Sequence, residues 1–140
     1  MKTLQHLLSP IKIRNLELPN RLVMPPMGTG LGNDDSTVSD ANLAYIKRRV
    51  QSGVGLVITE ITCVHPSGLV SSHALGVWDD KFIPGLTKMA AAIHDQGAKA
   101  CMQLHHCGRE NYLFLKQKKA IGPSAIPSFI FGFMGPPREM

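Results

Sequence analysis

The sequence lacks the long apolar segments that membrane insertion and secretion require. No apolar run approaches the roughly 18–20 residues of a membrane-spanning helix. The first six residues contain one lysine, and no apolar stretch of the secretory type follows them. We therefore expect a cytoplasmic protein with no membrane partner.

Cysteine is also scarce, and its spacing matches no common metal site. The three residues are Cys63, Cys101 and Cys107, an odd number, and no pair of them has the separation of a zinc ligand motif. In a cytosolic protein such thiols are normally reduced. The sequence therefore predicts neither a disulfide framework nor a metal centre.

Acidic residues are fewer than basic ones, which gives a net charge of +5. The basic residues gather at 47–49 and 116–119, and each group is short. We interpret them as a solvated helix face and a loop, and expect no nucleic-acid partner. The positive charge would also suit an anionic cofactor or substrate, although charge alone does not identify one.

What is present is a globular composition, with 44% hydrophobic and 18% charged residues. Alternating polarity predicts a short hairpin over residues 9–20 with its turn near Asn15. A short continuous apolar run predicts a strand buried on both faces within residues 21–27. A second buried strand is expected over residues 54–60, and a third strand over residues 99–105. Helices are expected over residues 41–50, after a cap at Ser39 or Asp40, and from Asp79 to the stop at Gly97. Beyond residue 106 the chain reads as loop.

Strands and helices alternate along the chain, which predicts a parallel α/β sheet. Because parallel crossovers are right-handed, the loops that follow the strands should share one side, where barrels carry their active sites. A dinucleotide-binding fold is disfavoured, since no helix starts directly after the glycines at 28–32. Glu60 also lies further along the chain than the roughly 20 residues expected of a ribose ligand.

Polar groups and free backbone gather where the three strands end, at residues 25–29, 60–62 and 103–109. Together they predict a platform for a flat, hydrogen-bonding ligand. Gln103 stands out because its amide offers both donors and an acceptor. A satisfied core amide is the alternative interpretation of Gln103.

His105, His106 and Cys107 follow one another at the end of the last strand. Neighbouring strand residues point to opposite faces, so a shared metal ion is disfavoured for the two histidines. Cys107 beside His106 suggests a nucleophile only if a third orienting group is present. We interpret Cys107 as a packed thiol.

Four segments, in order along nearly the whole chain, resemble the old yellow enzyme family of flavin oxidoreductases. They are residues 19–27, 55–60, 103–109 and 122–127. Residues 27–31 look most like the 2,4-dienoyl-CoA reductase and 2-enoate reductase branch. The resemblance implies an incomplete (β/α)8 TIM barrel: about the first three β strands with an N-terminal hairpin. Residues 1–140 would then be the N-terminal part of one FMN-binding domain.

The family's chemistry defines the expected ligands. The resemblance implies an FMN-dependent enzyme that takes hydride from NAD(P)H and reduces the activated C=C bond of an enoate or enoyl thioester. It leaves open whether the parent protein also carries a 4Fe–4S cluster and FAD.

The resemblance also assigns flavin contacts residue by residue. Pro25, Pro26 and Met27 would lie against the flavin through their backbone, and Ile61 would make a backbone contact near the ring. Gln103 would hydrogen-bond the pyrimidine edge. The sequence departs from the family at Gly28, where relatives carry a side chain that tunes the flavin or touches substrate.

No catalytic residue is assigned within the chain, because the family's substrate-anchoring pair and proton-donating tyrosine are expected beyond residue 140. We therefore expect the chain alone to bind FMN weakly and to be inactive. The alternative is a non-catalytic fragment that self-associates into a homo-oligomer through its exposed strand edges.

Overall fold

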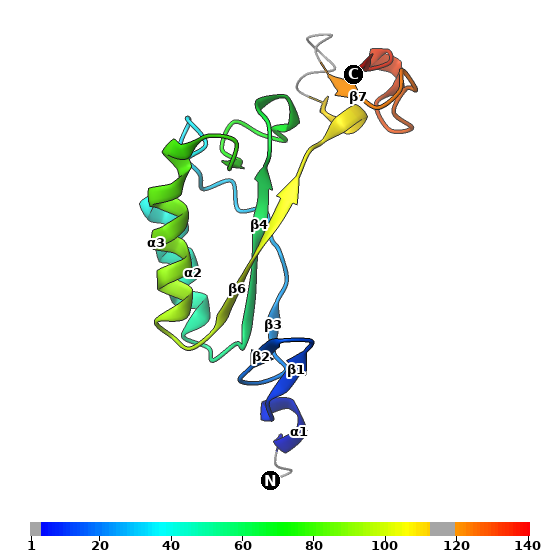
Figure 1. Ribbon diagram of the computed structural model, residues 1–140. Coiled ribbons are helices and arrows are strands. Elements are labelled where there is room, and N and C mark those ends of the chain that lie inside the picture. The colour runs from blue at the N-terminus through cyan, green and yellow to red at the C-terminus, as the bar shows by residue number, and fades with distance from the viewer. Residues whose placement is uncertain (1–3, 113–119) are drawn as a thin grey trace.

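The computed structural model of this chain describes residues 4–112 and 120–140. A parallel sheet runs along the middle of an elongated molecule, with two helices side by side along it (Figure 1). An N-terminal hairpin lies beyond one end of the sheet, and the C-terminal segment lies beyond the other. No helix in the described part of the chain is both long enough and apolar enough to cross a bilayer.

The predicted hairpin is confirmed. Strand β1 (Ile11–Ile13) pairs antiparallel with β2 (Leu16–Leu18). Arg14 occupies the turn with φ 52°, the left-handed conformation that a tight hairpin turn demands. A four-residue helix that the sequence pattern did not predict, α1 (Gln5–Leu8), precedes the hairpin.

The predicted parallel sheet is also confirmed. Its central strand β4 (Leu56–Cys63) pairs in parallel with β3 (Val23–Met24) and β6 (Lys99–His105). A short strand that was not predicted, β5 (Leu75–Gly76), pairs with the carboxyl end of β4. Strand β3 is shorter than expected because two prolines follow it, and proline has no N–H to donate to a ladder.

Helix α2 (Asp40–Val50) begins where the sequence predicted, with Ser39 as its N-cap. Helix α3 (Ile83–His94) begins later than predicted, because Asp79 instead caps a 3-10 turn, η2 (Asp80–Phe82). Gly97 follows α3 with φ 78°, a conformation that glycine adopts without a steric penalty. Both helices pack on the same face of the sheet (Figure 1).

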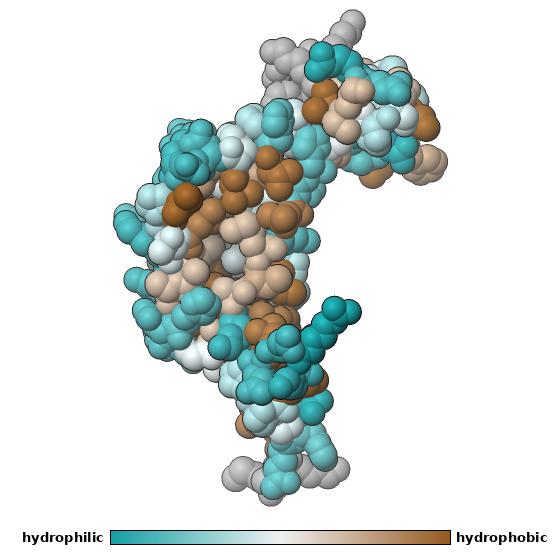
Figure 2. Space-filling view, in the orientation of Figure 1, coloured by the Kyte–Doolittle hydropathy of each residue, from teal (hydrophilic) through white to brown (hydrophobic). Residues whose placement is uncertain are grey.

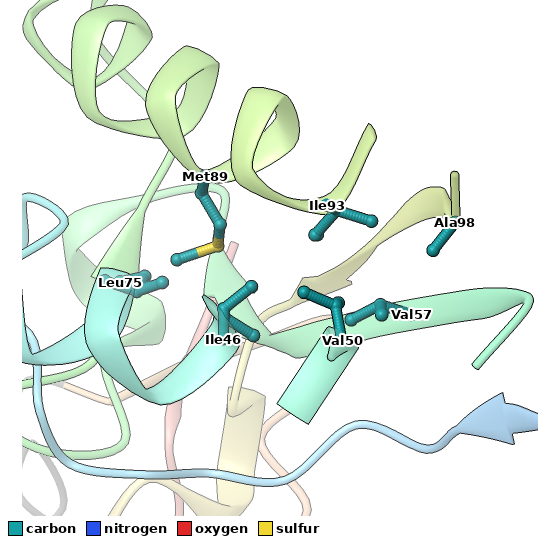
Figure 3. Close-up of a cluster of buried hydrophobic side chains, with 7 residues drawn as sticks. All are labelled: Ile46, Val50, Val57, Leu75, Met89, Ile93 and Ala98. Carbon is teal, nitrogen blue, oxygen red and sulfur yellow. The ribbon is translucent and has the colours of Figure 1, made fainter. Parts of the chain in front are cut away.

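The hydrophobic core lies between these helices and β4. Figure 3 shows side chains from α2, α3 and β4 that point toward one another. The buried cluster consists of Ile46, Val50, Val57, Leu75, Met89, Ile93 and Ala98. Because each of these elements contributes its apolar face to one cluster, the helices and the sheet are fixed relative to one another.

The expectation that the first strand is buried on both faces is wrong for β3, and β6 is exposed as well. Val23 is 46% exposed, Met102 36% and Leu104 64%. Among the described strands of this sheet, only β4 has a strand on either side, and the two helices cover one face. Figure 2 shows hydrophobic residues gathered over α3 and β6. Leu86 of α3 and Met102 of β6 help to line a hollow of about 250 Å3.

The C-terminal segment contains more structure than the loop that was predicted. Strand β7 (Ile121–Gly122) pairs in parallel with β8 (Arg138–Glu139). The segment also contains the 3-10 turns η3 (Gly108–Glu110) and η4 (Gly132–Met134). A further 3-10 turn, η1 (Pro66–Gly68), lies in the loop after β4. The basic group at 116–119 lies outside the described residues.

Candidate functional site

The carboxyl ends of β3, β4 and β6 lie at one edge of the sheet, because the three strands are parallel. Pro25 and Pro26 follow β3 directly. Ile61 and Gln103 are register partners in β4 and β6, so their side chains share a face. The structure therefore brings the predicted ligand residues to a common edge, and their contacts with a flavin stay a prediction.

A β-bulge in β4 produces this alignment. Between the pairs Ile58–Cys101 and Ile61–Gln103, β4 advances three residues while β6 advances two. Without the extra residue, Ile61 would point to the face opposite Gln103, since side chains alternate along a strand. The bulge therefore sets the face on which a ligand could meet both residues.

The edge offers unused hydrogen-bonding capacity. Gln103 is half-buried, and within the described residues its amide has no hydrogen-bond partner. A Cβ built on Gly28 would meet nothing within 4 Å, so the space beside the loop is open. The unpaired amide lies on β6, across β4 from the open, proline-rich segment that follows β3. This arrangement fits a flat heteroaromatic ring such as the isoalloxazine of FMN.

Met27 is the least enclosed of the predicted residues, with 56% of its surface exposed. It lines an open groove of about 580 Å3 together with Met24 and Tyr45. The guanidinium of Arg49 stacks over the Tyr45 ring in that groove, 3.3 Å from the ring centroid. Met27 thus borders the α2 side of the molecule.

The sequence interpretation missed a buried polar cluster next to these residues. Glu60 is 8% exposed and Asn42 is 1% exposed. The Thr29 hydroxyl donates to Glu60 Oε1 at 2.6 Å, and the Asn42 amide donates to the same oxygen at 3.0 Å. A carboxylate inside a buried strand that has no other charged residue was the signal that could have revealed this cluster.

Two loops at the same edge are joined by a histidine–serine chain. Gly108 N–H donates to His106 Nδ1, so in the neutral ring the proton lies on Nε2, 3.0 Å from Ser67 Oγ. The Ser67 hydroxyl in turn lies 2.7 Å from His65 Nδ1, which also accepts from the Ser67 N–H. Burial lowers the pKa of His106, and the neighbouring His65 and His105 rings lower it further.

Cys107 is a half-buried thiol 3.2 Å from His105 Nε2. Burial raises the pKa of Cys107, and the charge of Glu110 raises it further. A thiol with a raised pKa is a poor nucleophile, because only the thiolate attacks. The part of the chain that the structure describes holds no group of three potential metal ligands.

Comparison with known families gives a match over residues 6–131. The matching family model is described as the NADH:flavin oxidoreductase / NADH oxidase family. It covers the hairpin, the sheet, both long helices and every predicted ligand residue.

Solved structures with similar folds include a 2-naphthoyl-CoA reductase in complex with 2-naphthoyl-CoA, with a TM-score of 0.85 and 26% identity. The match covers 97% of this chain and 22% of that one. An old yellow enzyme homologue from Zymomonas mobilis matches with a TM-score of 0.76 and 28% identity, over 86% of this chain and 33% of that one. Old Yellow Enzyme from a Pichia species matches with a TM-score of 0.77 and 30% identity, over 86% of this chain and 32% of that one.

These matches place the mixed α/β fold of this chain among TIM-barrel enzymes. The chain spans between 22% and 33% of the length of these three structures.

Proposed function

Because the chain belongs to the NADH:flavin oxidoreductase / NADH oxidase family, we propose that it is part of an FMN-dependent oxidoreductase acting on activated C=C bonds. When bound, the flavin would carry hydride from NAD(P)H to the β-carbon of an electron-poor alkene. The chain's own residues would hold and orient the isoalloxazine ring at the carboxyl edge of the sheet.

Within this proposal, residues 1–140 are the N-terminal part of one barrel domain. Strands β3, β4 and β6 are its first three strands, and α2 and α3 are the helices that connect them. Two features of the described residues support this: one face of the sheet carries both helices, and the strand edges retain exposed apolar side chains. A closed barrel would cover such edges with further strands.

The observation that carries the proposal is the pairing of Ile61 with Gln103 beside the segment that follows β3. Gln103 supplies amide donors and an acceptor that match the alternating polar atoms of a pyrimidine edge. Pro25, Pro26 and Met27 supply backbone carbonyls on an adjacent strand end. No other place among the described residues combines an unpaired half-buried amide with three parallel strand ends.

The substrate class we propose is an enoate or an enoyl thioester. One of the similar structures holds 2-naphthoyl-CoA, a thioester conjugated to an unsaturated ring. A thioester carbonyl withdraws electrons from the adjacent double bond and prepares its β-carbon for hydride. The net charge of +5 on this chain also suits an anionic thioester.

FMN titration of the purified chain, followed by flavin fluorescence and visible absorption, tests the assignment. We expect weak binding by the wild type, and a Kd raised about threefold to tenfold by Gln103→Leu, because one hydrogen-bonded group is lost. Gln96→Leu is the matched control, since Gln96 is exposed after α3. Equal FMN affinity of the two variants would contradict the role of Gln103.

We also propose that this chain alone does not turn over an enoate, because the family's proton donor is expected later in the sequence. Oxidation of NADH by the purified chain with an enoate at an enzyme-like rate would overturn that part of the proposal. The flavin-site assignment would stand independently.

A second candidate function is self-association without catalysis. The exposed Met102 and Leu104 on β6 favour it, since an open strand edge with apolar side chains readily pairs with another copy. Sedimentation at increasing protein concentration, combined with the absorption spectrum, separates the candidates. A colourless oligomer supports self-association, and FMN binding by a monomer supports the flavin assignment.

A further inference from the structure

Glu60 is a buried carboxylate with an unusual set of partners. None of the ion pairs found among the described residues includes it. Instead three donors converge on its two oxygens. Thr29 donates its backbone N–H to Oε2 at 3.0 Å and its hydroxyl to Oε1 at 2.6 Å, and Asn42 donates its amide to Oε1 at 3.0 Å. Two N–H groups and one hydroxyl thus share the two oxygens of a single side chain, and carboxyl oxygens are suited to accept several such bonds.

The orientation of Asn42 is fixed by the start of α2. Its Oδ1 accepts the backbone N–H of Ser39, which directs Nδ2 toward Glu60 and toward the Thr29 hydroxyl. Ser39 Oγ donates to the carbonyl of Leu31, and Leu31 N–H donates to the Thr29 hydroxyl. The loop between β3 and α2 is therefore closed on itself and held against β4.

The position of this cluster links it to the predicted flavin site. Thr29 comes two residues after Met27, and Glu60 comes directly before Ile61. Glu60 also lies within the β-bulge that aligns Ile61 with Gln103. One carboxylate thus joins the loop that follows β3 to the carboxyl half of β4, next to the residues that would contact the ring.

We propose that Glu60 is a positioning residue that holds Thr29 and thereby sets how residues 25–28 approach the flavin. This inference rests on the proposed function. It adds to that function a polar residue that would act on the flavin through the backbone of the loop after β3. Its effect comes from geometry, since a segment that two hydrogen bonds hold against β4 loses little freedom when a ligand binds.

The experiment has two independent readouts. The first is amide hydrogen exchange at Thr29 and Leu31, measured by NMR without FMN. The second is FMN affinity. Glu60→Gln supplies a single acceptor oxygen in place of two, and we expect at least a tenfold faster exchange at both amides and a severalfold higher Kd for FMN. Glu17→Gln, on the exposed hairpin strand β2, is the matched control.

A second pair of variants keeps the proposal testable if Glu60→Gln does not fold. Thr29→Val removes the hydroxyl donor, whereas Thr29→Ser retains it. We expect Thr29→Val to behave like Glu60→Gln and Thr29→Ser to behave like the wild type. Exchange at Val57 and Ile58 should not change, because a positioning role is confined to the loop.

Two outcomes overturn the inference. One is Thr29 exchange within about twofold of the wild type in both Glu60→Gln and Thr29→Val. The other is a uniform rise in exchange through β4, which would show a general structural role. If the wild type binds no FMN, the proposed function fails, and the exchange data still decide whether Glu60 holds the loop.

Discussion

Strand β4 contributes to two different regions of the molecule. One is the apolar cluster beneath α2 and α3, and the other is the polar carboxyl edge of the sheet. Val57 in β4 is fully buried among aliphatic side chains. Three residues further on, Glu60 is nearly as buried but is surrounded by hydrogen-bond donors. One half of the strand serves packing, and the other half carries directional polar contacts.

The two regions contribute to the structure in different ways. Apolar burial is proportional to area and largely independent of direction, so the cluster stabilises the fold as a whole. Hydrogen bonds depend on distance and angle, so the edge determines where particular atoms lie. We therefore expect substitutions in the cluster to change the free energy of unfolding most, and substitutions at the edge to change local order and ligand binding.

The largest effect should come from Ile93→Ala. Ile93 is fully buried in the cluster, so the substitution removes apolar area and leaves a cavity. We expect a loss of about 2–5 kcal/mol in the free energy of unfolding, measured by urea denaturation. Ile83→Ala, at a position that is 56% exposed, is the control and should lose no more than about 0.5 kcal/mol. Similar losses for both variants would contradict the placement of the core.

A smaller difference in stability is expected between alanine substitutions at two glycines. A Cβ on Gly76 would lie 2.6 Å from the Trp78 ring and 2.7 Å from the Phe82 ring, so Gly76→Ala should lose about 1–3 kcal/mol of stability. A Cβ on Gly28 would meet nothing within 4 Å, so Gly28→Ala should stay within about 0.5 kcal/mol of the wild type. Thermal unfolding of the two variants measures the contrast. A strongly destabilised Gly28→Ala would show that the edge is closed.

The smallest effect concerns pH. Because burial lowers the pKa of His106, the unfolded chain takes up a proton at a higher pH than the folded chain does. The free energy of unfolding should therefore fall as pH is lowered through about 6.5. His106→Asn should reduce that slope, as measured by urea denaturation at about pH 8 and about pH 5. Identical slopes would show that the Ser67–His106 contact does not depend on a neutral ring.

Much of the fold could be predicted from local patterns. The hairpin turn, the Ser39 cap, the glycine stop at Gly97 and the bounds of β6 all follow from rules that act within a few residues. The start of α3 was wrong because Asp79 caps equally well the 3-10 turn that precedes the helix. Strand β5 was missed because a two-residue strand exists only through its pairing with β4.

The candidate site also combines features that the local sequence predicts with features that depend on strand pairing. The sequence by itself determined which groups stand at the strand ends, since the order of polar and apolar residues is fixed along each strand. Only the tertiary structure decided that Ile61 and Gln103 lie on the same face of the sheet. The bulge that shifts the register of β4 by one residue forms only when β4 pairs with β6. The tertiary structure likewise decided that Glu60 meets Thr29 and Asn42, since hydrogen bonds between residues 18 and 31 positions apart form only after the chain has folded.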